Sequence, residues 1–348
     1  MKKVMAGMAL WALLGVGAQA QTQQDLLKDG NGGSTDNVLT YGMGYHQNRY
    51  SALKQINKSN VKRLVPLWST GLSSNFGEQG QPLVYNGVMF IANAQYTIAI
   101  DVETGKQLWR TAVDYDPATP RVVCCGVSSK GVAVYNGKVF VGTIDAHLKA
   151  LDAKTGKEIW KVKVAEWKEG YSITSAPTVA NGVLMQGIAG GEYGIRGFVD
   201  GYDPDTGKRL YRRHTTPDPG EKGSETWPQD DSYKRGAAST WMTGSYDPQL
   251  DLVFWGTGNG GAWNPKERPG DSLYIASVVA VKPKTGEIAW HYQFTPGDPF
   301  DFDGVNENVL ADIKVNGVVR KVLMHADKNA FLYVIDRATG KLIAANEF

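Results

Sequence analysis

The sequence predicts an all-β fold, a β-propeller built from four-stranded blades. One observation is a short phrase that occurs five times, at residues 101–109 (DVETGKQLW), 152–160 (DAKTGKEIW), 203–211 (DPDTGKRLY), 282–290 (KPKTGEIAW) and 336–343 (DRATGKLI). Its threonines stand at positions 104, 155, 206, 285 and 339, so the steps are 51, 51, 79 and 54 residues. A period near 50 indicates an array of one supersecondary unit. The 41 glycines suit tight-turned β structure.

Each copy of the phrase has the pattern of two strands joined by a turn. An apolar run, such as residues 96–100 or 147–151, predicts the strand before it. Asp-x-x-Thr-Gly supplies the turn, since glycine adopts positive φ without strain. A second short strand then ends on an aromatic residue. The long third step contains a polar, Pro/Gly-rich stretch at residues 215–236, which predicts a loop on the binding face.

The first twenty residues have the pattern of a secretory signal peptide. Lys2 and Lys3 precede a mostly apolar stretch at residues 4–17, and Ala18-Gln19-Ala20 fits a cleavage site. The apolar stretch is too short for a comfortable membrane span, and no other segment approaches its hydrophobicity. We therefore expect residues 1–20 to be removed and residues 21–348 to form one propeller domain in the periplasm.

Composition and missing motifs exclude several functions. The net charge is +2 with both signs interspersed, so a nucleic-acid partner is not expected. No Gly-x-Gly-x-x-Gly leads from a strand into a helix, which argues against a dinucleotide site. No Cys-x-x-Cys-His is present, so the chain carries no covalent c-type haem.

The only two cysteines, Cys124 and Cys125, are neighbours in the sequence. In an exported protein an even cysteine count favours a disulfide, and each of these has only the other as a partner within the chain. Two small buried apolar residues are the alternative interpretation.

Acidic and amide side chains occur in three glycine-rich loops that follow apolar segments. They are Glu192 in residues 189–194, Asn259 in residues 255–260, and three aspartates in residues 296–304. Any one of them can be an ordinary turn residue. Together they offer only oxygen ligands, which suit a hard cation better than zinc.

An ordered series of motifs resembles the periplasmic quinoprotein alcohol dehydrogenases that use pyrroloquinoline quinone (PQQ), of the methanol and ethanol dehydrogenase type. The resemblance runs from about residue 37 to residue 348, through Cys124-Cys125, Thr174-Ser175-Ala176-Pro177, Gly190-Gly191-Glu192, Gly256-Thr257-Gly258-Asn259 and Asp301-Phe302-Asp303-Gly304. It implies the eight-bladed propeller of that family, of which this chain has the length for about five to six blades. The chain is therefore expected to be truncated at its C-terminal end.

The resemblance also implies roles for single residues. Cys124 and Cys125 match a vicinal disulfide over one face of the quinone, and Trp241 matches the indole over the other face. Lys328 matches the cation beside the reactive carbonyls. Further cofactor contacts are expected from Thr174, Ala189, Gly190, Gly191, Ser239, Gln79 and Lys130. The last two depart from the family pattern, which has Glu and Arg there, and lysine cannot form the bidentate pair that arginine forms.

For the metal, the resemblance implies Glu192, Asn259 and Asp301 as ligands, with Asp301 also as the catalytic base. Asp303 occupies a position that is usually small in calcium-using members and Asp in lanthanide-using members. A trivalent ion of similar size gains from one more carboxylate. The resemblance thus favours a lanthanide ion over calcium, with Asp303 as a plain turn residue being the alternative.

The implied activity is oxidation of a small primary alcohol to the aldehyde, with electrons passed to an external acceptor such as a cytochrome c. The resemblance leaves room for a homodimer. Two alternatives stay open: a PQQ enzyme for a polyol, polymer or aldehyde, and a non-catalytic propeller scaffold. The truncated chain alone could lack activity, because missing blades would remove cofactor contacts.

Overall fold

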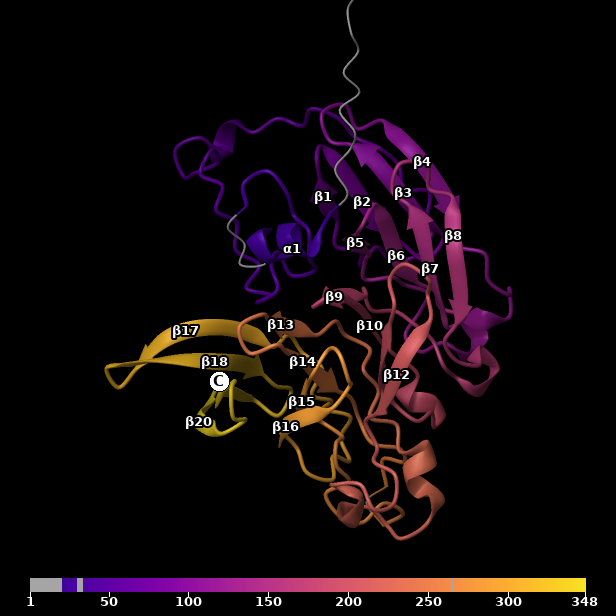
Figure 1. Ribbon diagram of the computed structural model, residues 1–348, viewed down its shortest axis with the longest axis vertical. Helices are drawn as coiled ribbons and strands as arrows, with labels where there is room; N and C mark the ends of the chain where they lie inside the picture. The colour runs from indigo at the N-terminus through magenta and orange to yellow at the C-terminus, as the bar shows by residue number, and fades with distance from the viewer. Residues whose placement is uncertain (1–20, 30–33, 265) are drawn as a thin grey trace, which may run out of the picture.

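A computed structural model describes residues 21–29, 34–264 and 266–348 of the protein. The described chain forms five four-stranded sheets, each with its strands in chain order, and the sheets follow one another round an open arc (Figure 1). All neighbouring strands are antiparallel, so each sheet is a simple meander. This is the predicted blade, and five blades agree with the expected five to six.

The first two blades contain β1 (Leu83–Tyr85), β2 (Val88–Ala92), β3 (Tyr96–Asp101), β4 (Gln107–Ala112), β5 (Ala133–Tyr135), β6 (Lys138–Gly142), β7 (His147–Asp152) and β8 (Glu158–Lys163). The third and fourth contain β9 (Thr178–Ala180), β10 (Val183–Gly187), β11 (Phe198–Tyr202), β12 (Arg209–His214), β13 (Ser245–Asp247), β14 (Leu252–Thr257), β15 (Ser277–Val281) and β16 (Ile288–Gln293). The fifth contains β17 (Val309–Val315), β18 (Val318–Ala326), β19 (Phe331–Asp336) and β20 (Leu342–Glu347).

Helix is confined to short segments of the described chain. The α-helix is α1 (Gln23–Asp29), and the 3₁₀ helices are η1 (Val61–Arg63), η2 (Thr119–Val122), η3 (Trp167–Glu169), η4 (Gly191–Tyr193), η5 (Ser224–Thr226) and η6 (Asp231–Arg235). None of the helices among the described residues is long and apolar enough to cross a membrane.

The repeated phrase forms the turn between the third and fourth strands of each blade. In the first blade, Asp101 Oδ1 accepts hydrogen bonds from Thr104 N and Thr104 Oγ1 at 2.8 and 2.6 Å. Gly105, with φ of 70°, donates its N–H to the carbonyl oxygen of Asp101. The copy that begins with Lys282 has no aspartate, and there Thr285 N donates to the carbonyl oxygen of Lys282 at 3.3 Å. The side-chain bonds recur at Asp152, Asp203 and Asp336.

The aromatic residue that ends each of the first four phrases docks on the turn of the next blade. Trp109 Nε1 donates to the carbonyl oxygen of Ala153 at 3.0 Å, and the indole lies against Gly156. A Cβ on Gly156 would stand 2.5 Å from the ring. The same contact recurs where Trp160 bonds to Pro204, Tyr211 to Pro283 and Trp290 to Arg337. Glycine is therefore required both by its φ and by the approach of the ring.

The hydrophobic core lies between the faces of successive sheets. The largest cluster includes Phe140 of β6, Leu184 of β10 and Trp255 of β14, all fully buried. β10, β14 and β15 are buried at every position, because the third and fourth blades are covered on both faces. In the fifth blade, at the end of the arc, β19 alternates between buried and more exposed positions.

The extra length in the long third step is divided between two connections, not confined to residues 215–236 as expected. One connection runs from β12 to β13 and the other from β14 to β15. They pack on each other: Trp227, Tyr233 and Ile275 share a buried cluster, and Trp227 Nε1 donates to the carbonyl oxygen of Leu273.

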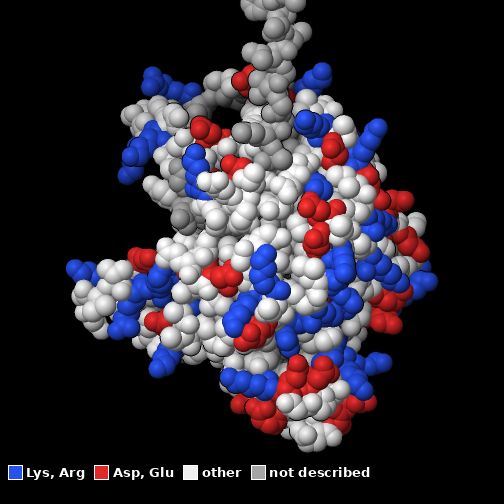
Figure 2. All heavy atoms as spheres, in the orientation of Figure 1, with Lys and Arg blue, Asp and Glu red and all other residues white. Residues whose placement is uncertain are grey.

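Helix α1 was not predicted, because seven residues are too few for a clear helical period. Thr22 and Asp25 cap it reciprocally, with Asp25 N donating to Thr22 Oγ1 and Thr22 N to Asp25 Oδ2. Leu26 inserts into the largest core cluster. The predicted signal peptide, residues 1–20, lies outside the described residues. On the face seen in Figure 2, acidic and basic side chains are interspersed.

Candidate functional site

The connections between strands on one side of the blades enclose a cavity of about 370 Å³. It is lined by Gln79, Cys124, Cys125, Ser128, Lys130, Ser172, Thr174, Ala189, Gly190, Glu192, Trp241, Asp301, Asp303 and Lys328. All of these except Ser128 and Ser172 belong to the site that the sequence predicts. Residues 215–236, the loop expected on the binding face, contribute no lining residue.

The cavity lining includes the cysteine pair and the indole of Trp241. Cys124 and Cys125 are joined by a disulfide, as the first of their two interpretations expects. The ammonium of Lys130 lies 5.1 Å from the centre of the Trp241 ring. Burial lowers the pKa of Lys130 to about 8, because a desolvated ammonium loses its water.

The loop after β16 brings Asp301 and Asp303 to the cavity beside Lys328, which lies in the turn between β18 and β19. Lys328 Nζ donates to the backbone carbonyl oxygen of Asp301 and lies 3.4 Å from Asp303 Oδ2. Asp301 and Asp303 have φ of 58° and 64°, a left-handed conformation that aspartate tolerates better than most residues.

Asp298, the third carboxylate of this loop, faces inward. It is fully buried, and its oxygens accept hydrogen bonds from Phe300 N at 2.9 Å, Phe302 N at 2.8 Å and Asp303 N at 3.3 Å. Residue type and loop position do not distinguish it from the other two, whereas the family resemblance singled out Asp301 and Asp303. Asp298 is a structural residue that fixes the loop, which leaves Asp301 and Asp303 at the cavity.

Burial raises the pKa of both cavity carboxylates. Burial, with a smaller contribution from Asp301, raises the pKa of Asp303 to about 6 against the opposing effects of Lys328 and the Asn259 N–H. Burial also raises the pKa of Asp301. A cation bound between them would reverse this effect, because it stabilises the charged forms.

Two buried oxygen atoms beside these carboxylates have no hydrogen-bond partner among the described residues. They are Asn259 Oδ1 and Asp301 Oδ1. Asn259 N donates to Asp303 Oδ1 at 2.7 Å, so the amide and the carboxylates share one region. Buried acceptors without donors are costly unless a cation or another donor is bound. The donor set therefore fits a hard metal ion.

Gly191 and Ser239 lie behind the cavity wall. A Cβ on Gly191 would come within 2.7 Å of Asn259 Oδ1 and 3.0 Å of Ser239 Oγ, so only glycine fits there. Glu192, in η4, has its carboxylate within 4.8 Å of the two cysteine sulfurs. It lines the same cavity as Asp301 and Asp303.

The structure also accounts for the remaining lining residues. Gln79 lines the cavity, whereas Glu78 accepts a hydrogen bond from Asn93 Nδ2 at 3.1 Å. Thr174 accepts the backbone N–H of Lys130 at 2.8 Å. Ser172 pairs with Ala189 through two backbone hydrogen bonds. Ser128 and Ser172 were missed because isolated serines carry no motif, although both are close in sequence to predicted residues.

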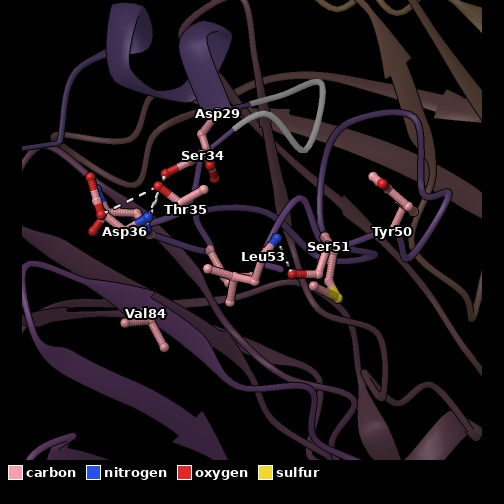
Figure 3. A pocket seen from close by; sticks show the side chains of 11 residues that line it. Asp29, Ser34, Thr35, Asp36, Tyr50, Ser51, Leu53 and Val84 are labelled. Carbon is pink, nitrogen blue, oxygen red and sulfur yellow. Dashed lines mark hydrogen bonds between the residues drawn. The ribbon is translucent and has the colours of Figure 1, made fainter. Parts of the chain in front are cut away.

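A second cavity, of about 210 Å³, lies near α1 and contains none of the predicted site residues (Figure 3). Its polar side chains bond to the neighbouring backbone: Ser34 Oγ accepts from Asn37 N at 3.0 Å, and Ser51 Oγ from Leu53 N at 3.3 Å. These are turn-forming contacts.

Comparison with known proteins agrees with this geometry. Residues 39–347 match the family described as the glucose/ethanol/alcohol dehydrogenase β-propeller domain, PQQ. The chain is 44% identical over 324 residues to quinohemoprotein alcohol dehydrogenase ADH IIB of Pseudomonas putida, covering 89% of this chain and 47% of that protein. It is 40% identical over 328 residues to a lanthanide-dependent methanol dehydrogenase of Methylacidiphilum fumariolicum, covering 87% of this chain and 53% of that protein.

Solved structures give the same result. A europium-containing methanol dehydrogenase superposes with a TM-score of 0.88 at 37% identity, covering 93% of this chain and 60% of that chain. The chain thus spans about half the length of the curated relatives that it matches. On the match over residues 39–347 and on these identities, the chain belongs to the family of PQQ-dependent alcohol dehydrogenase β-propellers.

Proposed function

We propose that this chain is the cofactor-binding part of a PQQ-dependent enzyme that oxidises a primary alcohol to the aldehyde. The observation that carries the proposal is one cavity that joins the Cys124–Cys125 disulfide and Trp241 to the carboxylates of Asp301 and Asp303. When bound, PQQ supplies the acceptor for the hydrogen and the two electrons that the alcohol carbon loses.

The residues of the chain bind the cofactor, accept the alcohol proton and position the base. The disulfide and Trp241 hold a flat ring between them, and Lys130, Thr174 and Gln79 offer polar groups at its edge. Asp301 accepts the alcohol proton, since its Oδ1 is free of hydrogen bonds and faces the same region as Asn259. Lys328 holds the backbone of Asp301 in place.

We infer that the metal is a trivalent lanthanide bound by Glu192, Asn259, Asp301 and Asp303. Three carboxylates exceed the charge of a divalent ion, and the raised pKa of Asp303 indicates that its charge is poorly balanced without a cation. A trivalent ion balances three carboxylates. Calcium is the alternative ion.

Replacement of Asp301 tests the catalytic proposal. In the whole protein loaded with PQQ and metal, Asp301→Asn should lower kcat with an artificial electron acceptor by at least about a hundredfold, because the base is lost together with a ligand. Asp114→Ala, which removes an exposed carboxylate elsewhere, is the matched control and should leave kcat unchanged. Retained activity in Asp301→Asn would sink the mechanism.

Replacement of Asp303 tests the choice of metal. The PQQ-loaded wild type should be activated by La³⁺ at far lower concentration than by Ca²⁺. Asp303→Ala should erase or reverse that preference, because a divalent ion is then balanced by two carboxylates. Equal activation of the wild type by both ions would leave Asp303 a turn residue and remove the lanthanide proposal.

The same proposal extends to the compartment, the electron acceptor and the substrate of the enzyme. We infer export to the periplasm, from the leader-like pattern of residues 1–20, and electron transfer to an acceptor such as a cytochrome c. A polyol, polymer or aldehyde substrate is the second candidate, and comparing kcat/KM for ethanol, glycerol and acetaldehyde distinguishes them.

A further inference from the structure

His325 is buried at the end of β18 and has no part in the proposed chemistry. Its Nδ1 lies 3.2 Å from Asn308 Oδ1, and its Nε2 lies 3.1 Å from Asp327 Oδ2. Asn308 can turn either its oxygen or its nitrogen toward Nδ1. With the amide nitrogen turned toward it, Nδ1 accepts and the ring proton stays on Nε2, which donates to Asp327 Oδ2; this is the orientation that gives the buried carboxylate its donor.

The Asp327 partner begins the turn that carries Lys328. Asp327 Oδ1 accepts a hydrogen bond from Asn329 N at 3.0 Å, while Oδ2 faces His325. The Asn329 side chain donates in turn to Tyr333 Oη at 2.8 Å and to Thr295 Oγ1 at 3.1 Å. Lys328 thus extends toward the cavity from between two anchored residues.

The face of the His325 ring contacts the other side of the site. It stacks on Phe294, with ring centres 4.0 Å apart and an angle of 6° between the planes. Phe294 directly follows β16 and begins the loop that carries Asp301 and Asp303. Lys328 Nζ contacts Asp301 and Asp303, so the turn after β18 and the loop after β16 meet there. The buried ring of His325 therefore contacts both of these segments.

We propose that His325 is a positioning residue, which sets the place of Lys328 relative to Asp301 through its Nε2 hydrogen bond to Asp327 and its stack on Phe294. A histidine that merely fills the core would need the ring volume alone. Here the ring also supplies the donor for a fully buried carboxylate next to Lys328. Without that donor, Asp327 would be a buried acceptor lacking its partner, and the turn would move to hydrate it.

Two substitutions separate the hydrogen bond from the ring. The side-chain amide of His325→Gln reaches as far as Nε2 and can still donate to Asp327. The amide of His325→Asn reaches only as far as Nδ1, so it keeps the Asn308 contact and loses the Asp327 contact. Both variants lose the aromatic stack, so a difference between them reports the hydrogen bond.

The readout is the rate at which an amine-reactive acetylating reagent labels Lys328, measured by peptide mass spectrometry on the 348-residue chain without cofactor. Lys314, exposed on β17 of the same blade, is the internal reference. His325→Asn should raise the ratio of Lys328 to Lys314 labelling by about threefold or more, because the turn opens. His325→Gln should restore a ratio close to that of the wild type.

An unchanged ratio in His325→Asn, or an equal rise in both variants, overturns the proposal. If His325→Asn does not fold, Asp327→Ala removes the same hydrogen bond from the other side and should raise the labelling ratio by a similar factor. An unchanged ratio in Asp327→Ala also overturns the proposal.

The importance of Lys328 for catalysis rests on the proposed function, but this labelling needs no PQQ. Failure of the proposed function is seen separately, as an absence of Trp241 fluorescence quenching when PQQ is added to the whole protein.

Discussion

Several histidines of this chain are kept neutral by burial, and His214 is the strongest case. Burial lowers its pKa to about 4, and the Arg196 charge lowers it further. Its ring packs edge-on against Phe198, and Nδ1 lies 3.4 Å from the carbonyl oxygen of Gly197. The residue ends β12, so protonating it places a cation where the third blade meets its outgoing connection.

This burial predicts a loss of stability in acid. The unfolded chain binds a proton on His214 below pH of about 6.5, whereas the folded chain does so only near pH 4. Stability is therefore fully present above the unfolded pKa and is lost as pH falls toward the folded one. His214→Asn keeps a donor near Gly197 and cannot titrate, so its urea midpoint should fall less between neutral pH and pH of about 5. Parallel pH profiles for the variant and the wild type would contradict this.

At the scale of the element, the blades are joined by the docking of an aromatic ring onto a turn glycine. Gly156 needs both a φ of 69° and room for the Trp109 ring. Gly87 has a similar φ of 76°, yet nothing lies within 4 Å of the place where its Cβ would be. An alanine at Gly87 therefore reports the free-energy cost of the left-handed backbone alone. An alanine at Gly156 reports that cost together with the loss of the contact between blades.

Gly87→Ala should cost about 1–2 kcal/mol in the free energy of unfolding, which is the cost of left-handed alanine. Gly156→Ala should cost about 1–3 kcal/mol more, because the Trp109 ring must move away. Denaturant titration of both variants gives the difference. Equal losses would mean that the ring adapts freely and that the docking contributes little to blade order.

At the scale of the whole molecule, the candidate site belongs to no single blade. Its lining comes from the segment before the first blade, from the connections between successive blades, and from turns within the third and fifth blades. The five sheets follow one another round an arc (Figure 1), and these segments meet at one cavity. The arrangement places Cys124 and Lys328, which are far apart in sequence, on the walls of one cavity.

Export is a prediction for the whole chain. Gln21, the residue after the predicted cleavage site, is buried, and its carbonyl oxygen accepts the N–H of Asn136 at 2.6 Å. Gln21, the first residue after the predicted cleavage site, is thus held against the turn between β5 and β6. Protein isolated from the periplasm of an expressing bacterium should begin at Gln21 by intact-mass analysis. A mature protein that retains Met1 would contradict the prediction.

The sequence by itself determined the blade and the position of its turn, because Asp101, Thr104 and Gly105 act within one short segment. It also indicated most of the residues that line the cavity, through motifs that keep their order along the chain. Local chemistry of this kind depends on neighbours in sequence and is repeated in each blade.

Only the tertiary structure decided how the three aspartates of one loop are used. The motifs singled out Asp301 and Asp303, which line the cavity, whereas Asp298 accepts hydrogen bonds from backbone N–H groups of its own loop. The pairing of His325 with Asp327 and its stack on Phe294 likewise depend on two blades meeting. The physical reason is that the charge and the direction of a side chain depend on its burial and on contacts with residues far away in sequence. The residues next to it in the sequence do not determine that burial or those contacts.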